Sequence, residues 1–73
     1  MTTSEKTILK NFGTRLKELR KEKKLSLRKL SYNCKVDFSK IGQMEKGLIN
    51  PTLLTITELA KGLDVDMKEL LDY

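Results

Sequence analysis

The positions of helix-capping and helix-breaking residues constrain the fold most. They divide the chain into five short segments with apolar residues at helical spacing. Within residues 4–23 apolar residues recur at steps of three and four, namely Ile8, Phe12, Leu16 and Leu19. This spacing predicts a first helix with one narrow apolar face directed at the core. No segment has the features that predict a strand. The sequence therefore predicts an all-α fold, a compact five-helix domain.

Capping residues mark the second and third helices. Ser26 is suited to cap a short helix over residues 27–34, and Asp37 is suited to cap the next one. Gly47 is well placed to end that third helix in a left-handed conformation. Gly42 lies in the middle of the same helix, where glycine costs about 1 kcal/mol relative to alanine. Its presence there calls for a reason.

The C-terminal part of the chain predicts two more helices. Asn50 is a plausible cap for the fourth helix, and Pro51 is favoured in a first helical turn. This helix is apolar around much of its circumference, so we expect it to be a central core helix that ends at Gly62. Asp66 is expected to cap the fifth helix, with Glu69 completing a weak capping box.

Size and composition limit the chain to one small domain. With 73 residues and 38% hydrophobic content, we interpret residues 1–73 as a single domain with a marginal core. One cysteine excludes an intramolecular disulfide, and without histidine no zinc site of usual composition is expected. We find no signal peptide and no run of about 18 apolar residues. The chain is therefore expected to be cytoplasmic, without a membrane role.

Charge is distributed unevenly along the chain, which has a net charge of +5. Residues 1–46 hold 13 Lys and Arg against 5 Asp and Glu, a net charge of +8. Residues 47–73 hold 2 against 5, a net charge of −3. This asymmetry favours a polyanionic partner on the N-terminal side, and nucleic acid or an acidic membrane surface are the candidates. The alternative is that the lysines are only solvated side chains on surface helices.

Two short helices joined by a tight turn, over about residues 27–46, form the helix-turn-helix pattern. The segments "LRKLSYNCKVDFSKIGQMEKG", "NP" and "LAKGLDV" make the chain resemble the Cro/phage-repressor-type (XRE-type) helix-turn-helix DNA-binding family. The resemblance covers residues 12–71. It implies a lambda-repressor-like DNA-binding fold and a transcriptional regulator that binds double-stranded DNA in a sequence-specific way.

The resemblance also implies structural roles. It assigns five residues to the core, namely Leu30, Cys34, Val36, Ile41 and Met44. It implies that the position of Ser31 requires a small residue, so that two helices can cross closely. Arg20 and Glu45 match a partly buried salt bridge that joins the first helix to the recognition helix in similar proteins.

The outward face of the third helix holds the expected base contacts, namely Phe38, Ser39, Gly42 and Gln43. Gln43 can pair with adenine N6 and N7, Ser39 with either kind of base edge, and Phe38 with a thymine methyl. Gly42 would let the helix backbone sit deep in the groove. The alternatives are that Gln43 is merely solvated, that Phe38 folds back over the core, and that the helix simply tolerates its glycine.

Phosphate contacts are expected from residues at the edges of this face, namely Ser26, Arg28, Lys40, Lys46 and Asn50. The family most often has glutamine at the position of Leu27, and leucine cannot make the phosphate contact expected there. Lys24 and Lys35 occupy turn positions where relatives often have a left-handed glycine.

Met67, Leu70 and Leu71 exceed what one short helix needs to bury, which suggests a homodimer through the C-terminal helix. Such a dimer would place two recognition helices about 34 Å apart on a palindromic operator. The alternative is that Leu70 and Leu71 close the core of a monomer. We expect no small-molecule ligand, because little chain remains for a sensing domain.

Catalytic residues are not expected, since no nucleophile and base can be assembled from these side chains, and no cofactor is implied. The rival function is a protein-interaction module of the same fold, such as an antitoxin or an adaptor whose main partner is a protein.

Overall fold

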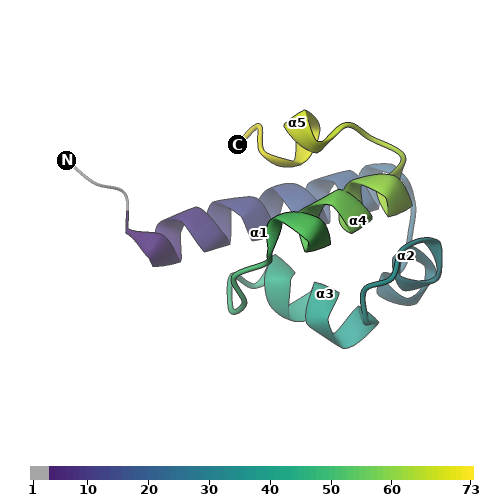
Figure 1. The fold of residues 1–73 in the computed structure, drawn as a ribbon, viewed down its shortest axis with the longest axis horizontal. Helices are drawn as coiled ribbons and strands as arrows, with labels where there is room; N and C mark the ends of the chain where they lie inside the picture. The colour runs from purple at the N-terminus through teal and green to yellow at the C-terminus, as the bar shows by residue number, and fades with distance from the viewer. Residues whose placement is uncertain (1–3) are drawn as a thin grey trace.

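The computed structural model describes residues 4–73, which form five helices: α1 (Glu5–Glu22), α2 (Leu27–Asn33), α3 (Phe38–Glu45), α4 (Leu53–Leu63) and α5 (Met67–Leu70). In Figure 1, α5 lies on one side of α1 and α4, and α2 and α3 lie on the other. The predicted all-α fold is confirmed, with no strand in residues 4–73. None of the described helices is long and apolar enough to span a membrane.

The capping predictions for α2 and α3 are confirmed. The Ser26 hydroxyl accepts a hydrogen bond from the Lys29 amide at 3.0 Å, and the Asp37 carboxylate accepts one from the Ser39 amide at 3.0 Å. Gly47 follows α3 with a φ of 76°, a conformation that glycine adopts without strain. Short local signals therefore set the bounds of both helices.

The cap predicted for α4 was wrong, whereas Asp66 occupies the N-cap position of α5 as predicted. Thr52, not Asn50, caps α4, and its hydroxyl accepts from the Thr55 amide at 3.1 Å. The chain stays out of the helix through Pro51, so the first helical residue is Leu53. Asp66 precedes α5 without a side-chain capping bond, so no capping box forms in this four-residue helix.

The sequence had predicted that α4 ends at Gly62, and this prediction was wrong. The helix continues to Leu63, and Asp64 takes the left-handed conformation with a φ of 59°. Gly62 is buried, and a Cβ atom there would lie 2.9 Å from both Leu30 Cδ1 and Cys34 Cβ. This glycine is therefore needed for the close approach of α2 to α4, not for a turn.

The two lysines predicted in left-handed turns differ. Lys24 has a φ of 59°, as expected, whereas Lys35 is not left-handed, so that prediction was wrong. The turn between α2 and α3 is closed differently: Cys34 is extended, and the Ser31 hydroxyl donates to the Val36 carbonyl oxygen at 2.7 Å. Ser31 thus has a bonding role beyond its small size.

The core draws on every helix and consists of Phe12, Leu16, Leu19, Leu30, Val36, Ile41, Met44, Leu59, Ala60, Leu63 and Leu70. Two expectations about it were wrong. Ile8 is 41% exposed, because the first turns of α1 extend past the other helices (Figure 1). Leu53 and Leu54, at the start of α4, are 69% and 78% exposed, so α4 is less central than its composition suggested.

Candidate nucleic-acid interface

Helix α3 has one buried face and one exposed face. Ile41 and Met44 are buried in the core, and they fix the rotation of the helix about its axis. The residues expected at bases turn outward: Phe38, Ser39 and Gln43 are exposed, and Gly42 is half-buried. Lys40 and Lys46, expected at phosphates, are also exposed. The helix therefore presents side chains that can bond to base edges and phosphates.

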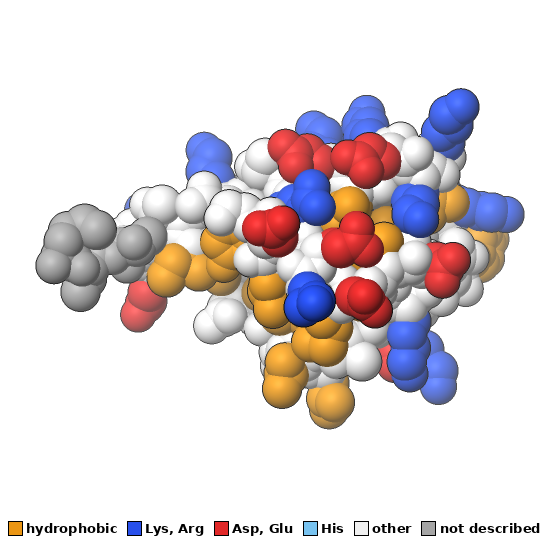
Figure 2. Space-filling view, turned by 90° about the horizontal axis from the view of Figure 1, so that it is seen from above, with side chains coloured by type: hydrophobic (Ala, Val, Ile, Leu, Met, Phe, Trp, Pro, Cys, Tyr) orange, Lys and Arg blue, Asp and Glu red, His pale blue; other side chains and the backbone are white. Residues whose placement is uncertain are grey.

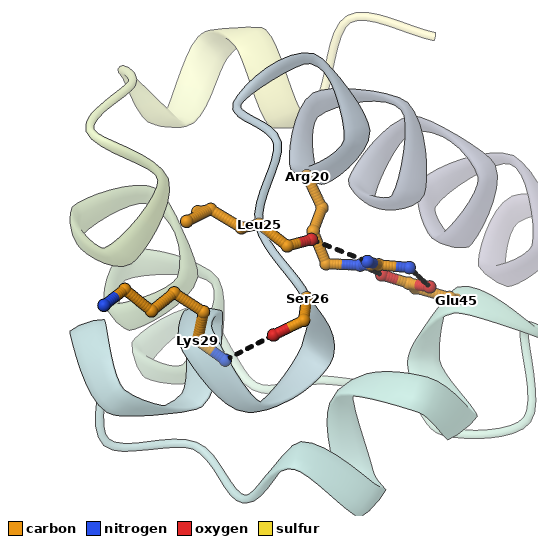
Figure 3. Close-up of polar contacts among 5 residues, drawn as sticks. All are labelled: Arg20, Leu25, Ser26, Lys29 and Glu45. Carbon is orange, nitrogen blue, oxygen red and sulfur yellow. Dashed lines mark hydrogen bonds and ion pairs between the residues drawn. The ribbon is translucent and has the colours of Figure 1, made fainter.

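An ion pair ties α3 to α1. Arg20 Nε lies 2.6 Å from Glu45 Oε2, and Arg20 Nη2 lies 3.0 Å from Glu45 Oε1, so the pair is bidentate (Figure 3). Arg20 Nη1 also donates to the Leu25 carbonyl oxygen at 2.8 Å, and the two charged side chains are only 10% and 6% exposed. The structure thus brings together the two residues expected to pair, and it adds the loop before α2 to the same junction.

A second contact between α1 and α3 was missed from the sequence. A Cβ atom at Gly13 would overlap the Met44 carbonyl oxygen and lie 2.6 Å from the Glu45 carbonyl oxygen. The backbone of α1 therefore touches the last turn of α3 directly. The only signal in the sequence was a glycine inside a long helix, which costs stability unless something requires it.

Gly42 has different surroundings from Gly13. A Cβ atom at Gly42 would meet only Leu27 Cδ1, at an ordinary contact distance of 3.5 Å. No neighbour within residues 4–73 therefore requires a glycine there. Leu27 itself is half-buried against the core, so it packs α2 on α3.

The residues expected at phosphates lie at several places around α3. Ser26 is the N-cap of α2. Its hydroxyl oxygen accepts a hydrogen bond from the Lys29 amide, which leaves the hydroxyl proton free to donate (Figure 3). Arg28 lies with its Cζ atom 4.5 Å from the centre of the Phe38 ring, a contact that the sequence did not predict. Phe38 is 36% exposed and is not among the core residues. Asn50 lies apart from them, in the exposed loop before α4.

The acidic residues of the C-terminal part gather on one face of the molecule, where Lys and Arg side chains are also present. Figure 2 shows the face that carries α5, on which Asp and Glu side chains gather. The exposed acidic residues of the C-terminal part are Asp64, Asp66, Glu69 and Asp72. Residues 26–46, on the opposite side, hold five Lys and Arg against two Asp and Glu, of which Glu45 is already paired. The α2 and α3 side is therefore the side suited to a polyanion.

The thiol of Cys34 is half-buried between α2 and α4. Its Sγ donates to the Leu30 carbonyl oxygen at 3.2 Å, and burial raises the pKa of the thiol above its ordinary value. A raised pKa lowers the thiolate fraction at neutral pH, so this side chain is a packing residue and a poor nucleophile. Within residues 4–73 there is no group of three or more His, Cys, Asp and Glu side chains arranged to hold a metal ion.

Comparison with known proteins gives consistent matches. Residues 16–70 match the protein family described as Helix-turn-helix (HTH_3). The chain is similar to the control protein C.BamHI of Bacillus amyloliquefaciens, with 33% identity over 63 residues, which cover 85% of this chain and 78% of that protein.

Solved structures share the fold. The restriction-modification controller protein C.AhdI from Aeromonas hydrophila matches with a TM-score of 0.82 and 42% identity, covering 85% of this chain and 94% of that one. An HTH_3 family transcriptional regulator from Vibrio cholerae matches with a TM-score of 0.90 and 28% identity, covering 94% of this chain and 39% of that one.

Proposed function

The chain belongs to the Helix-turn-helix (HTH_3) family of DNA-binding transcriptional regulators, and we propose that it is a controller of restriction-modification genes that reads its operator with α3. The observation that carries the proposal is the division of α3 into a buried apolar face and an exposed face of groups that can bond to bases. The assignment to the controller class is supported by the names of C.BamHI and C.AhdI.

In the proposed complex, the exposed face of α3 enters the major groove. Gln43 pairs with adenine N6 and N7, a contact worth about 1–3 kcal/mol of discrimination against other bases. Ser39 bonds to a second base edge, and Phe38 offers its ring edge to a thymine methyl. Gly42 adds no side chain between them, so the backbone of α3 approaches the groove floor closely.

Phosphates would be held around this face by five side chains, namely Ser26, Arg28, Lys40, Lys46 and Asn50. The two lysines lie on α3 itself, and Ser26 and Arg28 lie at the start of α2. Contacts of this kind set the register of the protein on the duplex without carrying sequence information.

Selection of bound duplexes from random DNA tests the proposal. The native protein is expected to enrich one sequence motif, and Gln43→Ala is expected to lose preference at an adenine position within it. Asn11→Ala is the matched control, because it removes an exposed amide from α1. If Gln43→Ala enriches the same motif with the same preference at each position, the assignment of Gln43 is wrong.

The rival function, a protein-interaction module of the same fold, makes a different prediction. Specific binding through several phosphates weakens steeply as salt rises, with a slope of about −0.9 per phosphate contact in a plot of log affinity against log salt. Affinity for the selected duplex that hardly responds to salt, or no selected motif at all, would favour the protein-interaction module.

We also propose a homodimer on a palindromic operator, with the C-terminal helix as the contact between subunits. Leu71 and Tyr73 support this, since they are 46% and 54% exposed. Leu70 does not contribute, because it is fully buried in the core, as the monomer alternative expected of it. A second exposed apolar surface, formed by Leu53 and Leu54, is the competing contact.

Sedimentation equilibrium distinguishes the two surfaces. Leu71→Asp is expected to convert a dimer into a monomer, because a charge buried in an apolar contact is costly. Leu54→Asp, which places the same charge on α4, is expected to leave the dimer intact. The reverse result would move the contact to α4, and a native protein that stays monomeric at high concentration would contradict the dimer.

A further inference from the structure

We propose that Arg28, whose guanidinium carbon lies over the ring of Phe38, is the main phosphate anchor at the start of α2, and that Phe38 acts as its positioning residue. The inference rests on the proposed DNA-binding function and names a contact within it. It also gives a second role to a phenylalanine that could otherwise be interpreted only as a base contact.

The two side chains join neighbouring helices at the surface. Arg28 is the second residue of α2 and Phe38 is the first residue of α3. The Arg28 Cζ atom lies 4.5 Å from the ring centre, within the range of about 6 Å for a cation–π interaction. Both residues are exposed, so the contact lies at the edge of the face that α3 offers to DNA.

The hydrogen-bonding groups of Arg28 are free. Within residues 4–73, Arg20 binds Glu45 and the Leu25 carbonyl, and Arg15 binds Glu18 and the Glu69 carbonyl. The Arg28 side chain makes no hydrogen bond or ion pair with any residue of this part of the chain. Stacking uses only the flat face of a guanidinium and leaves its in-plane N–H groups available, and those groups match a phosphate bidentately.

The position of Leu27 explains why Arg28 is the residue at the start of α2 that is available to bind a phosphate. Its side chain is half-buried and packs toward Gly42 of α3, so this first position of α2 is committed to holding the two helices together. The next side chain along α2 is Arg28, which is exposed. Because Phe38 already restricts the Arg28 side chain, less conformational freedom is lost when the guanidinium binds a phosphate.

The first test is the effect of single substitutions on affinity for a duplex recovered by selection and for a scrambled duplex of equal length. Arg28→Ala is expected to weaken binding to both about tenfold, as for loss of a charged hydrogen bond. The slope of log affinity against log salt should become shallower by about 0.9. Lys29→Ala is the matched control: it removes the same charge from the next position, which has no aromatic partner, and should change the slope less.

The second test is a double-mutant cycle. On the scrambled duplex, where a specific base contact of Phe38 does not contribute, Phe38→Leu is expected to weaken binding severalfold in the native background and to have no further effect when Arg28→Ala is present. Phe38→Tyr keeps the ring face and should bind as the native protein does. A parallel cycle between Phe38→Leu and Lys29→Ala should give independent effects. Affinities are compared well below the unfolding midpoint of every variant.

Two results would overturn the inference. Effects of Arg28→Ala and Phe38→Leu that multiply independently would show that Phe38 does not act through Arg28. An equal slope change for Arg28→Ala and Lys29→Ala would show that any lysine or arginine at the start of α2 is sufficient. By contrast, a native protein that does not distinguish the selected duplex from the scrambled one would overturn the proposed function itself.

Discussion

Gly13 and Gly42 both lie inside helices, but only Gly13 is required by a contact within residues 4–73. Gly13 lies against the carbonyl groups of Met44 and Glu45, so the packing of the protein itself excludes a side chain. Gly42 has only Leu27 nearby, at an ordinary contact distance. Since no contact within residues 4–73 requires glycine at Gly42, the proposed reason for it is the approach of a bound partner.

Alanine substitution separates the two cases. Gly42→Ala should stabilise the protein by about 1 kcal/mol, because alanine is the better helix former. It should also weaken DNA binding if the helix backbone approaches the groove closely. Gly13→Ala should destabilise the fold by about 1–3 kcal/mol, because its Cβ atom displaces α3. Urea denaturation and DNA titration measure both effects.

The outcome for Gly42 has a clear alternative. A Gly42→Ala variant that is more stable and binds DNA with unchanged affinity would show that α3 merely tolerates its glycine. A Gly13→Ala variant as stable as the native protein would show that α1 and α3 separate at little cost.

Helices α1 and α3 are joined at two points, and this junction sets the direction in which α3 leaves the core. The backbone contact at Gly13 lies beside the last turn of α3, and the Arg20–Glu45 pair lies at the same end. The other end of α3 is held by its cap at Asp37 and by the turn that Ser31 closes. A change at the junction would therefore tilt the whole exposed face of α3.

Loss of the ion pair is expected to act on stability first. Arg20→Ala leaves the Glu45 carboxylate buried without a partner, which typically costs about 3–5 kcal/mol. That is a large share of the stability of a small domain. The stability of Arg20→Lys should lie between that of the native protein and that of Arg20→Ala, because lysine keeps the charge but not the bidentate geometry. Lys21→Ala, which removes an exposed charge from the next position, is the control, and thermal unfolding is the measurement.

An Arg20→Ala variant that unfolds at the native temperature would contradict a structural role for the pair. Weaker DNA binding at unchanged stability would instead suggest that Arg20 contacts DNA directly.

The sequence predicted well those features that depend on residues close together in the chain. The caps Ser26 and Asp37 and the left-handed Gly47 depend on a few consecutive residues, and the periodicity of α3 was enough to assign Ile41 and Met44 to the core. Features that depend on packing between distant segments were missed. Gly62 resembled a helix end but makes room for α2, and the contacts of Gly13 and of Arg28 join helices whose approach no local pattern reveals.

The charge pattern belongs to the molecule as a single body. The acidic residues of the C-terminal part lie on the α5 face (Figure 2). Helix α3, whose lysines are exposed, lies on the other side of α1 and α4 (Figure 1). Equal changes of charge on the two faces should therefore have unequal effects on DNA binding.

Two lysines make the comparison. Lys46→Ala, at the end of α3, should make the slope of log affinity against log salt shallower by about 0.9, because one phosphate contact is lost. Lys68→Ala, on α5, removes the same charge from the acidic face and should leave the slope nearly unchanged. Equal slope changes for the two variants would show that net charge alone, and not the orientation of the protein, determines the salt dependence.

The carboxylates on the α5 face also bear on how the protein would approach DNA before the two molecules touch. The acidic residues of the α5 face and the exposed lysines of α3, on the other side, contribute an electric dipole across the body of the molecule. In the field of a duplex this dipole experiences a torque that turns α3 inward while the two molecules are still diffusing together. If α3 binds DNA as proposed, the acidic face would shorten the search for a productive orientation without touching DNA, and neutralising it would slow association while leaving the bound complex unchanged.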